Sequence, residues 1–290
     1  MSAGAAPTDP RPPRRRPDYL AHAVLLAGVL IFVLPIWVAF AGATQSAAAI
    51  NRGDLSLIPR LSGLDVFVRA LGFGNTAKGG VPIWHMLLVS FGMAMAIAIG
   101  KIVISALSAF AIAFFRFPFR MLAFWLIFVT LMLPVEVRII PTYAVMSGFH
   151  LINTFAGLTM PLIASATATL LFRQVFLAVP DELVEAAKLD GAGPMRFFFD
   201  ILLPVSGANL AALFVILFVY GWNQYLWPLL VATNGRLDTI VLGIVQMITT
   251  DQMTPWNIVM AATILSILPP VAVVLAMQRW FVKGLTEADK

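Results

Sequence analysis

Residues 86–115 read MLLVSFGMAMAIAIGKIVISALSAFAIAFF, and Lys101 is the only charged residue among them. A helix needs about 20 mainly apolar residues to cross a hydrocarbon core roughly 30 Å thick. This stretch therefore predicts a membrane-spanning helix with one cation near its middle. The whole chain agrees, because 60% of its residues are hydrophobic and 11% are charged. Ordinary soluble domains have about 45–50% apolar and about 25% charged residues.

Other stretches of the chain are also long and apolar enough to be spans. They are residues 20–43, 121–141, 155–178, 205–232 and 257–282. We therefore expect an all-α membrane protein with six transmembrane helices. Outside the spans we expect a basic, disordered tail at 1–19, a long polar segment at 44–85, a loop at 179–204 and a short tail at 283–290.

The basic residues indicate which side of the membrane each segment faces. With a cytoplasmic N-terminus, about twice as many Lys and Arg lie in the cytoplasmic segments as in the outer ones, as the positive-inside rule requires. Both termini and the loop 179–204 are therefore expected in the cytoplasm, and residues 44–85 in the periplasm. The apolar run 20–43 is too long for a cleaved signal peptide, whose core has about 7–15 residues.

The sequence lacks the residue patterns that several classes of function require. It has no cysteine, and His22, His85 and His150 lie far apart, so we expect no metal site. The net charge of +5 is not clustered on a candidate nucleic-acid-binding helix. The nearest approach to a phosphate-binding loop, Gly100-Lys101-Ile102, has Ile102 where Ser or Thr is required. We therefore expect neither an enzyme nor a resident cofactor.

The loop 179–204 reads VPDELVEAAKLDGAGPMRFFFDILLP. Pro180 is suited to a helix start, and Gly191 to its left-handed C-terminal cap. The pattern predicts a short helix over 181–190, a turn, and a second helix from Pro194 to Leu203. On the first helix Leu183, Ala186 and Ala187 share a face, which could fit closely against another protein. From the residues alone, a surface amphipathic helix between two spans is an equally good interpretation of this segment.

Three parts of this loop carry a resemblance to a known family: Glu185-Ala186-Ala187, then Asp190-Gly191-Ala192, then Pro204. They resemble the EAA loop of permease subunits from binding-protein-dependent ABC importers of the carbohydrate-uptake type. Other stretches resemble the members of that family that import sn-glycerol 3-phosphate. They are FRFPFR at 115–120, LMLPVEVRI at 131–139, ASATAT at 164–169, GWNQYLWPL at 221–229 and MQRWFV at 277–282.

The resemblance implies a type I importer permease fold in the bacterial inner membrane. It implies that the helix 181–190 docks on an ATPase subunit, with Glu185, Ala186, Ala187, Asp190 and Gly191 as the coupling residues. The implied partners are a second, non-identical permease, two copies of the ATPase and a periplasmic substrate-binding protein, besides the membrane lipids. ATP and Mg²⁺ would then be bound by the ATPase subunits.

The cargo implied is sn-glycerol 3-phosphate, with glycerophosphodiesters as a second possibility. Two alternatives stay open at this stage. One is a permease of the same family for another sugar or oligosaccharide. The other, from a different class, is an ATP-independent secondary transporter or a channel, which would need no docking helix.

Candidate residues of a translocation path are polar side chains within the expected spans. They are Lys101, Glu136, Asn223, Gln224 and Tyr225. A charge in mid-membrane is costly, so Lys101 either faces a water-filled path or pairs with a carboxylate such as Glu136. Glu136 and its neighbour Arg138 suit an outer vestibule or an interfacial structural role. Asn223 and Gln224 either line the path or bond to another helix.

Overall fold

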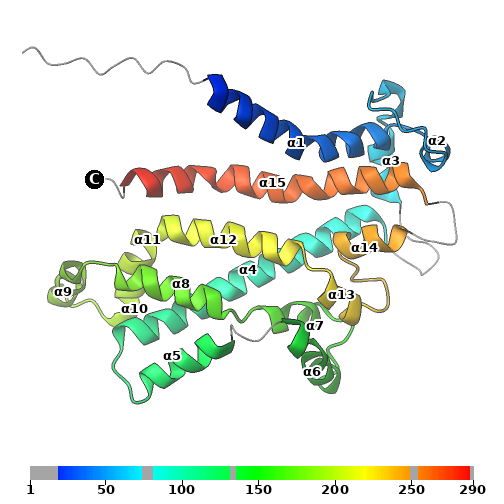
Figure 1. Cartoon of the computed structure of the whole chain (residues 1–290). Coiled ribbons are helices and arrows are strands. Elements are labelled where there is room, and N and C mark those ends of the chain that lie inside the picture. The colour runs from blue at the N-terminus through cyan, green and yellow to red at the C-terminus, as the bar shows by residue number, and fades with distance from the viewer. Residues whose placement is uncertain (1–18, 74–80, 131–134, 249–253, 288–290) are drawn as a thin grey trace, which may run out of the picture.

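The computed structural model describes residues 19–73, 81–130, 135–248 and 254–287, without the side chains of 135–136 and 280–287. All regular elements in these ranges are helices (Figure 1). Three are long and apolar enough to cross a membrane: α1 (Tyr19–Ala43), α4 (Ile83–Phe114) and α15 (Trp256–Glu287). The bounds of these helices lie within about five residues of the spans expected at 20–43, 86–115 and 257–282.

Two further pairs of helices are long and apolar enough for a span only when the two bent halves are taken together. In the first, α7 (Phe155–Thr159) and η4 (Met160–Leu162) meet α8 (Ala166–Leu177) at 50°. The second joins the helical segment Pro194–Val205 to α12 (Gly207–Trp222) at 77°. If each bent pair is one span, the described residues hold up to five spans.

The sixth expected span, at 121–141, falls on α5 (Arg120–Val129) and α6 (Val135–Gly148). Between these two helices, residues 131–134 lie outside the described part of the chain. α5 is apolar but too short to span a membrane alone. The count of six therefore stays a prediction.

Helix α4 is the centre of the molecule and packs against both α8 and α12. Small residues permit this close packing. A Cβ atom at Gly221 of α12 would lie 2.9 Å from the Cα of Ala94, and one at Gly100 would lie 2.8 Å from Ile163. Close backbone approach at glycine is a usual way for membrane helices to gain van der Waals contact. The Ser105 hydroxyl adds a polar tie, donating to the Ser165 carbonyl at 3.1 Å.

The segment between α1 and α4 folds over the helix ends as short pieces. These are α2 (Ala47–Asn51), η1 (Leu61–Gly63) and α3 (Val66–Gly72). The amide of Gln45 holds the segment in place, because Nε2 donates to the Ala41 and Ser56 carbonyls while Oε1 accepts the Ser56 N–H. The helix α14 (Ile240–Met247) lies at the same end of the molecule (Figure 1).

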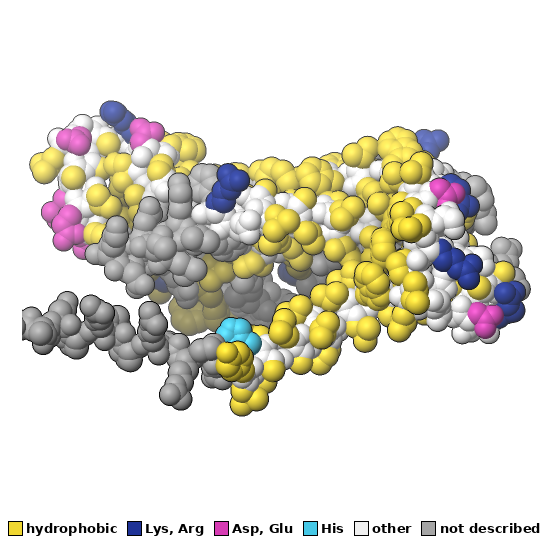
Figure 2. Space-filling view, turned by 90° about the horizontal axis from the view of Figure 1, so that it is seen from above, with side chains coloured by type: hydrophobic (Ala, Val, Ile, Leu, Met, Phe, Trp, Pro, Cys, Tyr) yellow, Lys and Arg dark blue, Asp and Glu magenta, His cyan; other side chains and the backbone are white. Residues whose placement is uncertain are grey.

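At the opposite end lies α9 (Asp181–Leu189), the first helix of the loop 179–204 (Figure 1). The start of α1 and the end of α15 lie on that side too, as the expected topology requires. Charged side chains gather toward the two ends, and the middle of the visible face is hydrophobic (Figure 2). This pattern fits a protein whose middle is surrounded by lipid.

Candidate functional site

Helix α9 is short, and its stability comes from its two ends. Asp181 and Glu182 occupy the first turn and Lys188 the last, so both sets of charges complement the helix dipole. At the C-terminal end the N–H of Gly191 donates to the Lys188 carbonyl at 3.1 Å, and that of Ala192 to the Ala187 carbonyl at 2.9 Å. These two bonds form a Schellman motif.

The Schellman motif requires a left-handed residue at position 191. The φ angle of Gly191 is +69°, a conformation that side chains with a Cβ disfavour. The sequence prediction of a helix ending at a glycine cap is confirmed, with Asp190 as the capping residue.

The second half of the loop is also helical, as predicted. α10 (Pro194–Phe197), the π-type turn η5 (Phe198–Leu202) and α11 (Leu203–Val205) follow one another without a break. Phe197 and Phe198 are buried, and the Phe198 ring centroid lies 4.8 Å from that of Phe110 on α4. The Phe176 ring of α8 is 6.4 Å from Phe198. The loop is thus anchored to the core by aromatic rings.

The two faces of α9 differ sharply. Ala187 is buried against the chain's own core, so this alanine anchors the helix and is not free to meet another protein. Glu185 and Ala186 are exposed, and Leu189, one turn further on, is 89% exposed. Sequence reasoning grouped Ala187 with the docking face and did not single out Leu189. Leu189 lies on the same helix face as Glu185 and Ala186, and this spacing is the sequence signal that would have identified it.

Lys101 lies deep in the packed helices, with only 6% of its surface exposed. Its Nζ atom is 3.7 Å from the centroid of the Tyr220 ring on α12. Side chains on a helix point toward its N-terminus, so the ammonium reaches the level at which Gly221 brings α12 close to α4. Sequence reasoning singled out Tyr225, whereas the aromatic ring that contacts Lys101 belongs to Tyr220.

Arg138 lies on α6 and lines a small pocket of about 70 Å³ with Thr142, Leu162 and Trp227. Leu162 of this pocket lies at the bend before α8, next to Ile163, against which Gly100, the neighbour of Lys101, is packed. Among the side chains that the structure describes, the ion pairs are Arg52–Asp54, Arg69–Asp65 and Arg196–Asp200, and none involves either of these two cations. The side chain of Glu136, the expected partner of Lys101, lies outside the described residues.

Asn223, Gln224 and Tyr225 form the break between α12 and α13 (Leu226–Val231). The helix expected over 205–232 therefore ends at Trp222, and residues 226–231 form a separate short helix. Gln224 donates through Nε2 to the Tyr220 carbonyl at 3.1 Å. Asn223 is exposed, while Gln224 and Tyr225 are half-buried. The break thus begins within one turn of the ring that covers Lys101.

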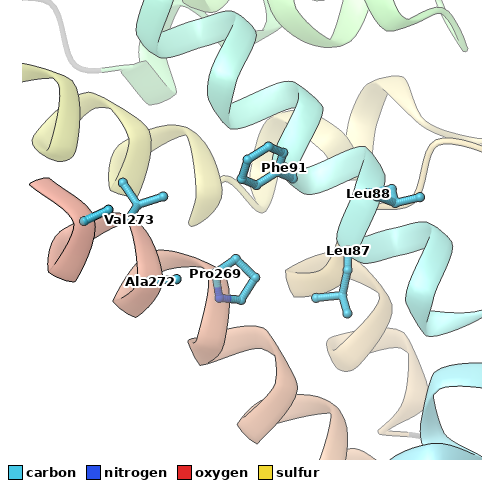
Figure 3. A pocket seen from close by; sticks show the side chains of 7 residues that line it. Leu87, Leu88, Phe91, Pro269, Ala272 and Val273 are labelled. Carbon is cyan, nitrogen blue, oxygen red and sulfur yellow. The ribbon is translucent and has the colours of Figure 1, made fainter.

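A groove of about 470 Å³ opens between α4 and α15 (Figure 3). Leu87, Leu88 and Phe91 face Pro269, Ala272 and Val273 across it, so its walls are apolar. Such a surface suits lipid or another helix rather than a polar cargo. No group of three or more potential metal ligands occurs in the part of the chain that the structure describes.

Residues 88–287 match the family described as "Binding-protein-dependent transport system inner membrane component". The chain is 56% identical to a protein of Rhizobium meliloti (strain 1021) over 274 residues, which cover 94% of this chain and 97% of that one. It is 53% identical to a protein of Salmonella typhi over 278 residues, covering 96% and 99%. Both relatives are named sn-glycerol-3-phosphate transport system permease protein UgpE.

A solved structure shares the fold. It is the crystal structure of a bacterial ABC transporter involved in the import of the acidic polysaccharide alginate. The TM-score is 0.74 at 19% identity, and the match covers 94% of this chain and all of the matched chain. At this identity the likeness concerns the arrangement of the helices alone.

Proposed function

Because the chain belongs to the family of binding-protein-dependent transport system inner membrane components, we propose that it is the permease subunit of an ATP-driven importer for sn-glycerol 3-phosphate. Relatives that carry this cargo in their name are more than half identical to the chain over nearly its whole length. The chain is a multi-helix inner-membrane protein and a transport subunit.

The observation that carries the proposed mechanism is the exposed face of α9. A helix that stands at one end of the molecule, has a glycine cap at its C-terminus and presents Leu189 to solvent suits a partner with an apolar socket. Glu185 and Asp190 would add charge complementarity to basic groups around that socket. We assign the coupling role to Glu185, Ala186, Asp190 and Gly191, joined by Leu189, with Ala187 fixing the helix to its own chain.

Movement of α9 would reach the membrane through the aromatic cluster. Phe197 and Phe198 connect the loop to Phe110 of α4 and Phe176 of α8. Packed interiors transmit displacement because they resist compression. An ATPase that closes on ATP would therefore shift α4 and α8 together, and two discrete packings of these helices would give the outward and inward states.

The partners follow from this arrangement. The source of energy lies in another chain. Two ATPase subunits would bind ATP and Mg²⁺. One would contact α9, and the other would contact the corresponding helix of a second, non-identical permease. A periplasmic binding protein would deliver the cargo at the end formed by α2, α3 and α14. The translocation path would run past Lys101, with Glu136, Asn223, Gln224 and Tyr225 as further candidates near its outer part.

The test is transport by the complete complex in liposomes. We expect uptake of labelled sn-glycerol 3-phosphate that requires ATP, and ATP hydrolysis that rises when the loaded binding protein is added. Stimulation by an oligosaccharide but not by sn-glycerol 3-phosphate would favour a different cargo within the same family. Uptake by this chain alone, without ATP, would contradict the proposal and favour a secondary transporter.

A further inference from the structure

Lys101 and Arg138 have no carboxylate partner among the described side chains, and of the two only Lys101 is buried. Lys101 is buried in mid-bundle, and Arg138 lies at the pocket that it lines with Thr142 and Leu162. A buried cation is costly unless it is paired or faces a polar cavity. Ile163 lies against Gly100, the residue before Lys101, and directly follows Leu162 of the Arg138 pocket, so both cations stand near the same bend.

The contact with Tyr220 compensates only part of this cost. The face of an aromatic ring attracts a cation by up to about 2 kcal/mol in a desolvated setting. A buried ammonium loses several kcal/mol of hydration. The ring itself offers the ammonium no hydrogen-bond acceptor, since its centroid rather than its hydroxyl is the neighbour. An anion that accepted hydrogen bonds from both cations would compensate the burial of Lys101.

We propose that Lys101 and Arg138 form a recognition site for the phosphate group of the cargo on the translocation path, and that the Tyr220 ring holds the Lys101 ammonium while the site is empty. This inference rests on the proposed function. The guanidinium is suited to the role because its planar fork matches two phosphate oxygens, while the ammonium acts as a point charge. Tyr220 would move aside as the phosphate arrives.

The site is placed where both bent spans meet the central helix. Leu162, at the bend before α8, lines the Arg138 pocket and also packs in the cluster that includes Tyr220. Tyr220 precedes the break after α12 by less than one turn. A change in either bend would therefore alter the separation of the two cations, which gives a route for releasing the phosphate in the inward state.

The experiment uses the complete complex in liposomes and compares Lys101→Met, Lys101→Arg and Arg138→Gln. Hydrogen bonds to charged groups contribute roughly 1.5–3 kcal/mol, so Lys101→Met and Arg138→Gln should each lower uptake about ten- to hundredfold. Lys101→Arg should retain most of the uptake. ATP hydrolysis stimulated by the loaded binding protein should persist in all three, so the number of cargo molecules imported per ATP should fall in the two charge-removing variants.

Two results would overturn the inference. The first is wild-type uptake per ATP in Arg138→Gln, an exposed position whose substitution should not disturb assembly. The second is recovery of wild-type uptake in the double variant Lys101→Met with Glu136→Gln, because Lys101 would then serve only as the counter-ion of Glu136. If the unmodified complex imports no sn-glycerol 3-phosphate at all, the proposed function itself fails.

Discussion

Gly191 is the residue on which the shape of the coupling loop depends most directly. Its φ angle of +69° completes the Schellman motif at the end of α9. A Cβ in the left-handed region costs about 1–2 kcal/mol, so Gly191→Ala should loosen the last turn of α9. We expect the purified complex to hydrolyse ATP with weaker stimulation by the loaded binding protein and with fewer cargo molecules imported per ATP.

Gly193 offers a matched control two residues away. Its φ angle is −68°, and a Cβ there would meet no atom within 4 Å. Gly193→Ala should therefore behave as the unmodified protein in both measurements. Equal coupling in Gly191→Ala and the unmodified complex would show that the geometry of this cap does not matter for docking.

Individual residues also show which contacts could be predicted from the sequence and which could not. Pro180, Gly191 and Pro194 mark helix ends through local backbone preferences, and the structure confirms the helices that they predict. The neighbour of Lys101 was missed, because contact with Tyr220 depends on how closely α12 approaches α4 at Gly221. No local pattern encodes that distance. The inward position of Ala187 was missed for the same reason.

Some helices could be predicted from the sequence and others could not. The straight spans α1, α4 and α15 were predictable because length and apolar composition alone define them. The 50° bend was not, since it falls inside the span expected at 155–178, whereas the 77° bend falls at the boundary between the helix expected at 194–203 and the span expected at 205–232. Asn223 and Gln224 did signal a polar break, and the structure ends α12 there, but the separate helix α13 beyond it was not expected.

The outward face of α9 can be tested by one substitution. Leu189 is 89% exposed, and burying a leucine side chain in a partner contributes about 1.5–3 kcal/mol. Leu189→Glu should therefore reduce co-purification of the ATPase subunits roughly tenfold or more. Membrane insertion and pairing with the second permease should be unaffected, because this face makes no contribution to the chain's own core.

Leu61 is a suitable control for that substitution. It is 84% exposed on η1, at the other end of the molecule. Leu61→Glu adds the same charge but should leave the yield of co-purified ATPase unchanged. If both variants lost the ATPase equally, general damage to the protein would explain the result better than a docking face on α9.

The whole molecule leaves a large apolar surface uncovered. The buried residues of α1 are limited to Ala41, Gly42 and Ala43 at its end, although the helix is apolar throughout. Leu20, Ile31 and Phe32 are each more than two-thirds exposed. A soluble protein could not tolerate such a surface. Lipid and the second permease are the surroundings that would cover it, which is why the isolated chain looks incomplete.

The orientation of the molecule in the membrane stays a prediction, and the absence of cysteine from the sequence makes it directly testable. Single cysteines can be introduced by Ser62→Cys on η1 and by Gly193→Cys next to α9. If α9 meets an ATPase in the cytoplasm, a membrane-impermeant maleimide should label Ser62→Cys in cells whose outer membrane alone is permeable. Gly193→Cys should react only after the inner membrane is opened. The reverse pattern would place α9 on the side of the binding protein, where no ATP is available, and coupling through this helix would then be physically impossible.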